Sequence, residues 1–251
     1  MNQDITPKKD KSPTGAAPDM YPTAVSPTVI KRLPRYFRYL RELIAQGKLR
    51  ISSGELSMLM DVTASQIRQD LNCFGGFGQQ GYGYNVNYLY AKICEILGVG
   101  AGLRAIVVGM GDLGRALVRA TMFEKRGVDI IGLFDIDRTL VGKQVAGQAV
   151  RDMATLEEFC RENVVDFAVL TVPKDAAVTV ATQLTEYGIS ALWNFTGKEL
   201  PLPRDILVEN VHLGDSLMTL DYRLCARREA AAAREPDEPL PPTDKEEDQP
   251  L

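Results

Sequence analysis

The first half of the chain begins with one long helical pattern. Between Val29 and Gly47, apolar residues recur at three- and four-residue steps, which predicts a helix with one buried face. The residues on that face are Ile30, Leu33, Phe37, Leu40, Leu43 and Ile44. Gly47 is expected to end the helix. Pro34 makes the start uncertain, because proline is tolerated only close to a first turn.

Two shorter apolar runs follow, and each is preceded by a helix-capping pattern. Ser52 to Glu55 and Thr63 to Gln66 both fit the capping box, in which Ser or Thr is followed three residues later by Glu or Gln. Two short helices separated by the tight stretch at 61–62 predict a helix-turn-helix. The glycine-punctuated aromatics from Phe74 to Tyr84 then suit a β-hairpin wing.

From Leu103 onward the rhythm changes to strands alternating with helices. The strand candidates are Ala105–Val108, Ile130–Phe134, Phe167–Val172, Ala191–Phe195 and Leu207–Val211. Helical segments are expected from near Asp112, over Leu156–Cys160, over Lys174–Tyr187 and, last, over Asp215–Arg228. This alternation predicts a parallel sheet with helices on both faces.

A glycine-rich turn lies where the first of these strands meets its helix. The turn reads Gly109-Met110-Gly111-Asp112-Leu113-Gly114, a GxGxxG sequence. Gly109 permits the tight turn, Gly111 lets the backbone approach a pyrophosphate, and Gly114 permits close packing of helix on strand. Because the motif follows a strand and opens a helix, it predicts a Rossmann dinucleotide site rather than a turn that binds nothing.

The acidic partner of such a site is also present. Asp135 ends the second strand, about 20 residues after the glycines, where a carboxylate accepts hydrogen bonds from the adenosine ribose. It repels a 2′-phosphate, so NAD or NADH is favoured over the phosphorylated form. Thr171-Val172-Pro173 ends a later strand at the same sheet edge. This segment either lines the nicotinamide half or simply begins a helix.

The predicted fold class is an α/β Rossmann domain with an N-terminal winged-helix (helix-turn-helix) domain and a C-terminal helix. Proline and charge dominate both chain ends, which are expected to be disordered. The predicted parts are an arm at 1–25, a winged-helix domain at 26–88, a connecting helix and linker at 89–102, the Rossmann domain at 103–212, the last helix at 213–228 and an acidic tail at 229–251.

Charge is distributed unevenly along the chain, whose net charge is -4. From Ser26 to Gln80, eight Lys and Arg residues stand against four Asp and Glu residues, which indicates a polyanionic partner. The second helix of a helix-turn-helix reads bases in the major groove. The candidates there are Ser65, Gln66, Arg68 and Gln69, with Lys31, Arg32, Arg35 and Ser53 for phosphates. Alternatively, these charges only solvate a small helical domain.

Other classes of protein find little support. The four cysteines are widely spaced and His212 is the sole histidine, so neither a zinc site nor a disulfide framework is expected. No signal peptide or membrane-spanning segment is visible, which places the protein in the cytoplasm. No catalytic group is expected beside the nucleotide, so we predict a binding protein rather than an enzyme.

Both halves of the chain resemble the Rex family of redox-sensing repressors, from about Ser26 to Arg228. The stretches that carry the resemblance are Val29–Pro34, Ile51–Leu56, Val62–Arg68, Phe74–Gly75, Gly81–Tyr84, Gly109–Gly114, Phe134–Asp137, Leu170–Pro173 and Asn194–Phe195. The resemblance adds Asn194 to the cofactor residues, and it adds Gln79, Gln80 and Tyr82 in the wing to the DNA-contacting residues.

The resemblance implies a homodimer on a palindromic double-stranded operator, with the last helix swapped between protomers. It implies that NADH releases the operator and that NAD competes without causing release. Two rival hypotheses remain: an NAD-dependent oxidoreductase with an appended helical domain, and a DNA-binding protein whose Rossmann domain only dimerises.

The chain departs from the family pattern in two places. Gln69, Gln79 and Gln80 stand where the family usually has Lys or Arg, so operator sequence and salt dependence are expected to differ. A family Tyr–Asp pair corresponds here to Ala120 and His212. Since both partners are changed, other contacts are expected to hold the NADH-bound state. His212 either adds pH sensitivity or packs as a neutral side chain.

Overall fold

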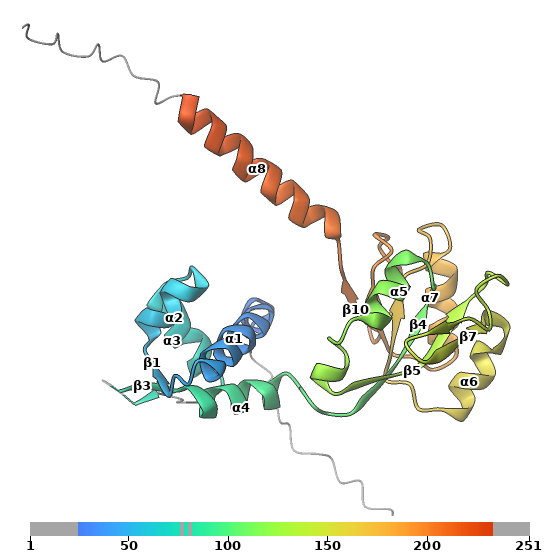
Figure 1. Ribbon diagram of the computed structural model, residues 1–251, viewed down its shortest axis with the longest axis horizontal. Helices are drawn as coiled ribbons and strands as arrows, with labels where there is room; N and C mark the ends of the chain where they lie inside the picture. Colours follow the sequence, from blue (N-terminus) through green and yellow to red (C-terminus); the bar gives the residue numbers. More distant parts are fainter. Residues whose placement is uncertain (1–24, 76–77, 80–81, 233–251) are drawn as a thin grey trace, which may run out of the picture. The chain divides into compact units, whose positions relative to one another are not determined.

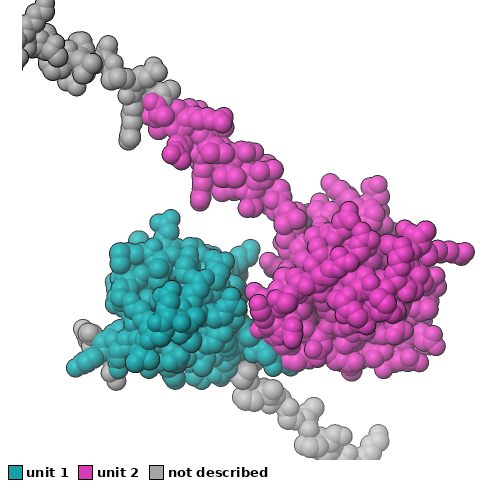
Figure 2. All heavy atoms as spheres, viewed as in Figure 1, with its two compact units in different colours: residues 1–101 teal, residues 102–251 magenta. Residues whose placement is uncertain are grey.

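The chain folds as two units, residues 1–101 and residues 102–251 (Figure 2). The computed structural model describes residues 25–75, 78–79 and 82–232, and each unit is considered by itself. The expectation of disorder at the two ends falls almost wholly outside these residues. Residues 229–232 are the exception, because they continue the last helix rather than belonging to a disordered tail.

Unit 1 has the winged-helix arrangement that the sequence pattern predicts. Its elements are α1 (Pro27–Ala45), β1 (Arg50–Ile51), α2 (Ser53–Met60), α3 (Ala64–Asn72), β2 (Gly78–Gln79), β3 (Gly83–Asn85) and α4 (Val86–Ile96) (Figure 1). The three strands form an antiparallel sheet in the order β1-β3-β2, so β2 and β3 make the hairpin wing.

The helix starts of unit 1 follow from their capping residues. The Ser26 side chain caps α1, and Pro27 occupies its first turn. The helix therefore starts well before Pro34, which lies inside it. The Ser52–Glu55 capping box is complete, with bonds of 3.1 and 2.8 Å. The second predicted box is only half formed. Thr63 accepts from the Gln66 amide N–H at 3.1 Å, but the Gln66 side chain bonds elsewhere.

Helix α4 belongs to the core of unit 1, so the predicted boundary at residue 88 is wrong. Leu89 and Ile93 are fully buried against α1, and the Tyr90 ring stacks on Phe37 at a centroid distance of 5.2 Å. The sequence pattern assigned this segment to a connection because its apolar residues were not matched to α1. The linker is therefore the short stretch that follows Ile96.

Unit 2 is a doubly wound sheet. Its elements are β4 (Leu103–Val108), α5 (Asp112–Arg119), a 3-10 turn at Glu124–Arg126, β5 (Val128–Asp135), β6 (Gln144–Val145), β7 (Gln148–Asp152), a second 3-10 turn at Met153–Thr155, α6 (Leu156–Glu162), β8 (Phe167–Leu170), α7 (Ala177–Glu186), β9 (Ala191–Asn194), β10 (Leu207–Asn210) and α8 (Leu213–Ala232). The spatial order is β10-β9-β8-β4-β5-β7-β6. All neighbours are parallel except β6 and β7, and the six parallel strands have the Rossmann order 3-2-1-4-5-6.

The sequence pattern does not predict the β6–β7 hairpin, because its strands are short and mixed in polarity. Its two-residue turn is Ala146-Gly147, and both residues have positive φ, 48° and 82°. Such turns match the twist of a hairpin, but Asn-Gly is the usual signal and is absent here. Strand β7 matters for the site, because it extends the sheet beyond Asp135 on β5.

The two faces of the sheet bury different side chains. On one face, Val108, Phe134 and Leu170 pack with α6 and α7. On the other, Val107, Leu133 and Val169 pack with Val118 of α5 and with Phe123. Successive strands are added on one side of β4, as β5 and β7, and then on its other side, as β8, β9 and β10. The point between β4 and β8 where the order switches is where such sheets bind ligands.

Helix α8 confirms the predicted C-terminal helix but is longer than expected. It runs from Leu213 to Ala232 rather than ending at residue 228, because the alanines that follow favour helix. Its side chains from Leu213 to 231 are all exposed, including Leu217 at 59% and Leu224 at 42%. A helix with this many exposed leucines is not stabilised by its own chain.

Candidate nucleotide site and DNA-binding face

Two positions of the glycine loop in unit 2 accept no residue other than glycine. Gly109 has φ of 96°, and a Cβ there would lie 2.7 Å from the Thr171 carbonyl. A Cβ on Gly114 would lie 2.0 Å from the Gly109 carbonyl oxygen. The Thr171 hydroxyl donates to that same oxygen at 2.6 Å. Strand β8 thus fixes the loop at the end of β4.

Helix α5 begins at this loop with free space in front of it. Gly111 is its N-cap, supplies no side-chain cap, and has no other atom within 4 Å of the position that a Cβ would take. The first-turn N–H groups and the positive end of the helix dipole are therefore open to an anion. Leu113 is half-buried behind them, and Asp112 is turned to Arg115 in a 2.6 Å ion pair.

Asp135 ends β5 with its carboxylate held by the backbone. Its Oδ2 accepts from the Met110 amide N–H at 2.5 Å, and its Oδ1 accepts from the Asp137 amide N–H at 2.8 Å. The carboxylate is therefore fixed beside the glycine loop, as the sequence predicts. Each oxygen keeps a lone pair with which to accept from a ligand hydroxyl.

A cavity of about 560 Å³ opens beside this carboxylate, within the usual size of a small-molecule site. Gly109 and Asp135 line it together with Val172 and Pro173. The remaining lining residues are Val108, Ile136, Met153, Ala154, Leu156, Glu157, Ala176, Thr179, Val180, Gln183 and Tyr187. Val172 and Pro173 thus line the same cavity as Asp135.

Asn194 has a different place from the other cofactor candidates. It is 1% exposed, and its amide nitrogen donates to the Lys198 carbonyl and to Asn210 Oδ1 at 2.8 and 2.7 Å. Its oxygen accepts from both the amide and the hydroxyl of Thr196. These bonds tie the ends of β9 and β10 together, so the structure gives Asn194 a supporting position within the protein.

On the DNA side, α3 presents part of the predicted set to solvent. Ser65, Arg68 and Gln69 are exposed. Arg68 Nη1 donates to Ser53 Oγ at 3.0 Å, which joins the starts of α2 and α3 through their side chains. Lys31 on α1 is exposed as well. These four positions and Ser53 are available to a partner.

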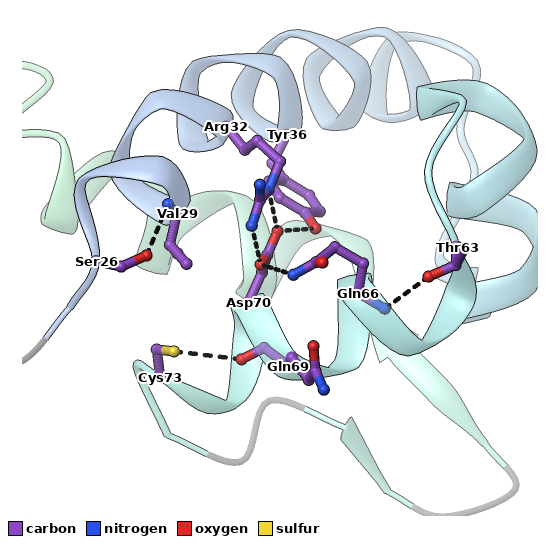
Figure 3. Close-up of polar contacts among 9 residues, drawn as sticks. All are labelled: Ser26, Val29, Arg32, Tyr36, Thr63, Gln66, Gln69, Asp70 and Cys73. Carbon is purple, nitrogen blue, oxygen red and sulfur yellow. Dashed lines mark hydrogen bonds and ion pairs between the residues drawn. The ribbon is translucent and has the colours of Figure 1, made fainter.

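Two other candidates face inward, around an acidic residue that the sequence reading did not single out (Figure 3). Asp70 is fully buried, and Arg32 clamps it through Nε and Nη2 at 2.7 and 2.6 Å. Tyr36 Oη and Gln66 Nε2 also donate to it, at 3.0 and 2.9 Å. Burial opposes the charge, but the hydrogen bonds from Arg32, Gln66 and Tyr36 outweigh it and lower the Asp70 pKa.

The same network acts on the tyrosine. Burial first, and then the nearby Asp70 carboxylate, raise the pKa of Tyr36 far above its ordinary value. Arg35 is also engaged internally, since its Nη2 donates to the Met60 carbonyl. Asp70 could have been noticed in the sequence, because it lies three residues after Ile67 and just before Leu71 on the buried face of α3.

The wing adds one cation that the sequence reading missed. Arg50 of β1 donates to the Tyr82 carbonyl at 3.3 Å and lies 5.9 Å from the centre of its ring. Tyr82 itself is 69% exposed. Gln79 lies on β2, and Gln80 falls outside the described residues.

Comparisons with known proteins agree on both units. A family model described as "Putative DNA-binding protein N-terminus" matches residues 24–72, and one described as "CoA binding domain" matches residues 102–197. The Redox-sensing transcriptional repressor Rex of Thermoanaerobacter sp. (strain X514) is 52% identical over 202 residues, which are 80% of this chain and 90% of that protein. Its counterpart from Caldicellulosiruptor bescii is 50% identical over 200 residues, 80% and 92% of the two chains. This chain belongs to the Rex family.

Solved structures of RSP, a Rex-family repressor, are similar to this Rex chain. RSP in complex with β-NAD+ and operator DNA is 49% identical, with a TM-score of 0.77 over 85% of this chain and 98% of that one. RSP, in complex with β-NADH, is 46% identical, with a TM-score of 0.78 over 85% and 100%. The predicted family and fold class are confirmed.

In this Rex chain, Ala120 and His212 stand where the family pattern has a Tyr–Asp pair, and the structure shows what surrounds each of them. Ala120 ends α5 as its C-cap residue. His212 Nε2 lies 3.6 Å from Glu199 Oε1, and Glu199 Oε2 accepts from Asn210 Nδ2 at 3.3 Å. His212 therefore connects the start of α8 to the loop between β9 and β10.

The Tyr-x-x-x-Lys spacing of many dehydrogenases occurs once, at Tyr88 and Lys92, but on α4 of unit 1, where Lys92 pairs with Glu95 at 2.7 Å. In the described part of the chain, no group of three His, Cys, Asp or Glu side chains could hold a metal ion. None of the described helices is long and apolar enough to cross a membrane.

Proposed function

We propose that this Rex chain is a cytoplasmic DNA-binding repressor that senses the NADH/NAD balance, and that NADH releases it from a palindromic operator. The observation that carries the proposal is a Rossmann loop with a fixed acidic partner, joined in one chain to a winged helix. The relatives support it, since they are redox-sensing repressors and since RSP forms complexes with β-NAD+ and operator DNA and with β-NADH.

The nucleotide is proposed to bind across the glycine loop. The open N-terminus of α5 at Gly111 and Asp112 receives the pyrophosphate, and Asp135 accepts from the adenosine ribose. The apolar cavity lined by Val172 and Pro173 holds the adenine. A 2′-phosphate would meet the Asp135 carboxylate, so NADH is bound in preference to NADPH.

The DNA is proposed to receive α3 in its major groove. Ser65, Arg68 and Gln69 face the bases, Lys31 contacts phosphate, and Tyr82 of the wing lies beside the duplex with Arg50. Arg32, Arg35 and Gln66 act in this proposal by holding the helices in place.

The working protein is proposed to be a homodimer in which α8 packs on the second copy. Leu213, Leu217, Leu220 and Leu224 are 65, 59, 52 and 42% exposed. Full burial of a leucine is worth about 1.5–3 kcal/mol, so covering the exposed half of each would contribute about 0.8–1.5 kcal/mol. Light scattering after size-exclusion chromatography tests this directly. A chain that ends at residue 212 is expected to be a monomer, and a dimer of unchanged stability would contradict the swapped helix.

The function is tested by fluorescence anisotropy of a labelled operator, captured first from genomic fragments. NADH is expected to release the duplex, and NAD to compete with NADH without releasing it. Asp135→Ala should weaken NADH binding at least tenfold and reduce the response. Asp129→Ala, at the opposite end of the same strand, is the matched control and should respond normally.

The same assay separates the rival hypotheses. If NADH releases the operator from neither the parent nor Asp135→Ala, and no substrate is turned over, the Rossmann unit serves only assembly. If NADH leaves operator binding unchanged and the chain turns over candidate substrates with NAD, it is an oxidoreductase with an appended helical domain. The names of the relatives, all repressors, favour the sensor.

A further inference from the structure

A second cavity in unit 2 is not part of the nucleotide site. It has a volume of about 350 Å³ and lies on the α5 face of the sheet, whereas the nucleotide cavity lies on the face of α6 and α7. Its lining residues are Met110, Arg115, Arg119, Leu140, Lys143, Gln144, Val145 and Val150. Met110, Val145 and Val150 are buried and give it an apolar floor.

The rim of this cavity is cationic. Arg115 and Arg119 come from α5, Lys143 comes from the loop before β6, and no lining residue is acidic. Arg115 already pairs with Asp112. The side chains of Arg119 and Lys143 form no hydrogen bond or ion pair with any residue in the described part of the chain. Two cations from different elements thus converge on one opening. The acidic side chain of Asp137 interacts electrostatically with Lys143, but it does not line the cavity.

A cationic rim around an apolar floor selects an anion with a small organic body. An Arg guanidinium beside a Lys ammonium matches the two charges and three oxygens of a phosphate group. The cavity lies in the size range of small-molecule sites and is too small for a dinucleotide. Gln144 supplies an amide for a hydroxyl or carbonyl of the body.

We propose that this cavity binds a small phosphate monoester, with its phosphate on Arg119 and Lys143 and its body on Met110, Val145 and Val150. The site is separate from the nucleotide cavity but touches the same loop. The Met110 side chain lines the new cavity, while the Met110 amide N–H bonds to Asp135. A metabolite bound here therefore lies directly behind the dinucleotide loop.

Isothermal titration of the full chain with glycerol 3-phosphate at low ionic strength tests the proposal. Binding is expected for the ester but not for glycerol, and it should weaken at least tenfold in the double variant Arg119→Gln, Lys143→Gln. The control variant Lys125→Gln, Arg126→Gln removes the same charge from a turn that does not line the cavity, and it should bind within twofold of the parent.

NADH distinguishes the two sites. The ester should still bind when the chain is saturated with NADH, and the Arg119/Lys143 variant should keep its NADH affinity, measured by energy transfer from Trp193, the sole tryptophan. The proposal is overturned if the parent does not bind the ester at about 10 mM, or if succinate binds equally well. It is also overturned if the control loses binding as strongly, or if NADH displaces the ester.

Discussion

Replacing Asp70 with Asn removes the charge at the centre of unit 1 while keeping its shape. Asp70 accepts four hydrogen bonds: Nε of Arg32 and Oη of Tyr36 donate to Oδ2, and Nη2 of Arg32 and Nε2 of Gln66 donate to Oδ1. An asparagine has one oxygen and one NH₂ group. Two of the four donors would therefore meet the NH₂ group, which cannot accept their hydrogen bonds. The Arg32 charge would remain without a counter-ion.

The cost can be estimated from the burial of the pair. Removing one partner of a buried ion pair typically costs about 3–5 kcal/mol. The Arg32 side chain is 18% exposed and Asp70 is fully buried, so water can reach only one partner. We therefore expect about 3 kcal/mol, the lower end of that range. Every 1.4 kcal/mol is tenfold, so the folding equilibrium of unit 1 should fall roughly a hundredfold.

Urea unfolding with two probes localises this loss. The sole tryptophan, Trp193, lies on β9 and reports on unit 2, whereas far-UV circular dichroism also follows the four helices of unit 1. Asp70→Asn should move the early part of the circular dichroism transition to lower urea and leave the Trp193 transition in place.

The exposed Asp61→Asn is the matched control, because Asn also tolerates the left-handed conformation of that residue. It should change the free energy of unfolding by less than about 0.5 kcal/mol. The reasoning fails if Asp70→Asn costs less than about 1 kcal/mol, or if it shifts the Trp193 transition as far as the helical signal.

Four other outcomes follow from the structure. Gly114→Ala should destabilise unit 2 and abolish NADH binding, whereas Gly111→Ala, which meets no atom, should weaken NADH binding in a titration without lowering the Trp193 unfolding midpoint. Lys31→Ala should lower the slope of log operator affinity against log salt by about 0.9 per protomer, with unchanged thermal stability. Lys48 foremost, then Ser52, lower the pKa of Glu55 to about 2 from 4.5, so its contribution is full above pH 4.5 and disappears as the pH falls toward 2. The urea midpoint of the parent should therefore fall with pH across that window, and this pH dependence should be weaker in Glu55→Gln.

The geometry of the glycine loop could be predicted because its determinants are local. Gly109, Gly114 and Asp135 belong to one strand–helix–strand unit, and each has a role fixed by its place in that unit. Asn194 could not be assigned in the same way. Its buried amide is committed to Lys198 and Asn210, and only the paired ends of β9 and β10 reveal this.

The DNA-binding face was harder to predict because neighbouring cations have opposite fates. Lys31 and Arg32 are adjacent on α1 and have the same charge, yet one is exposed and the other clamps an acid. What decides between them is Asp70, which lies on another helix and whose position depends on how α3 packs. Composition alone therefore overestimates the number of cations that unit 1 leaves free for a partner.

This correction concentrates the proposed readout on one side chain. With Gln66 turned inward to Asp70 and Gln69 uncharged, Arg68 is the only cation on α3. Its exposed guanidinium donates to Ser53 Oγ at 3.0 Å, which favours one orientation of the side chain before a base is met. Such a tether lowers the entropy lost on binding and fixes the approach of α3 relative to α2. Since Arg favours the O6 and N7 atoms of guanine, the operator half-site should contain one guanine whose replacement costs about 1–3 kcal/mol. Contacts of the glutamines should discriminate less.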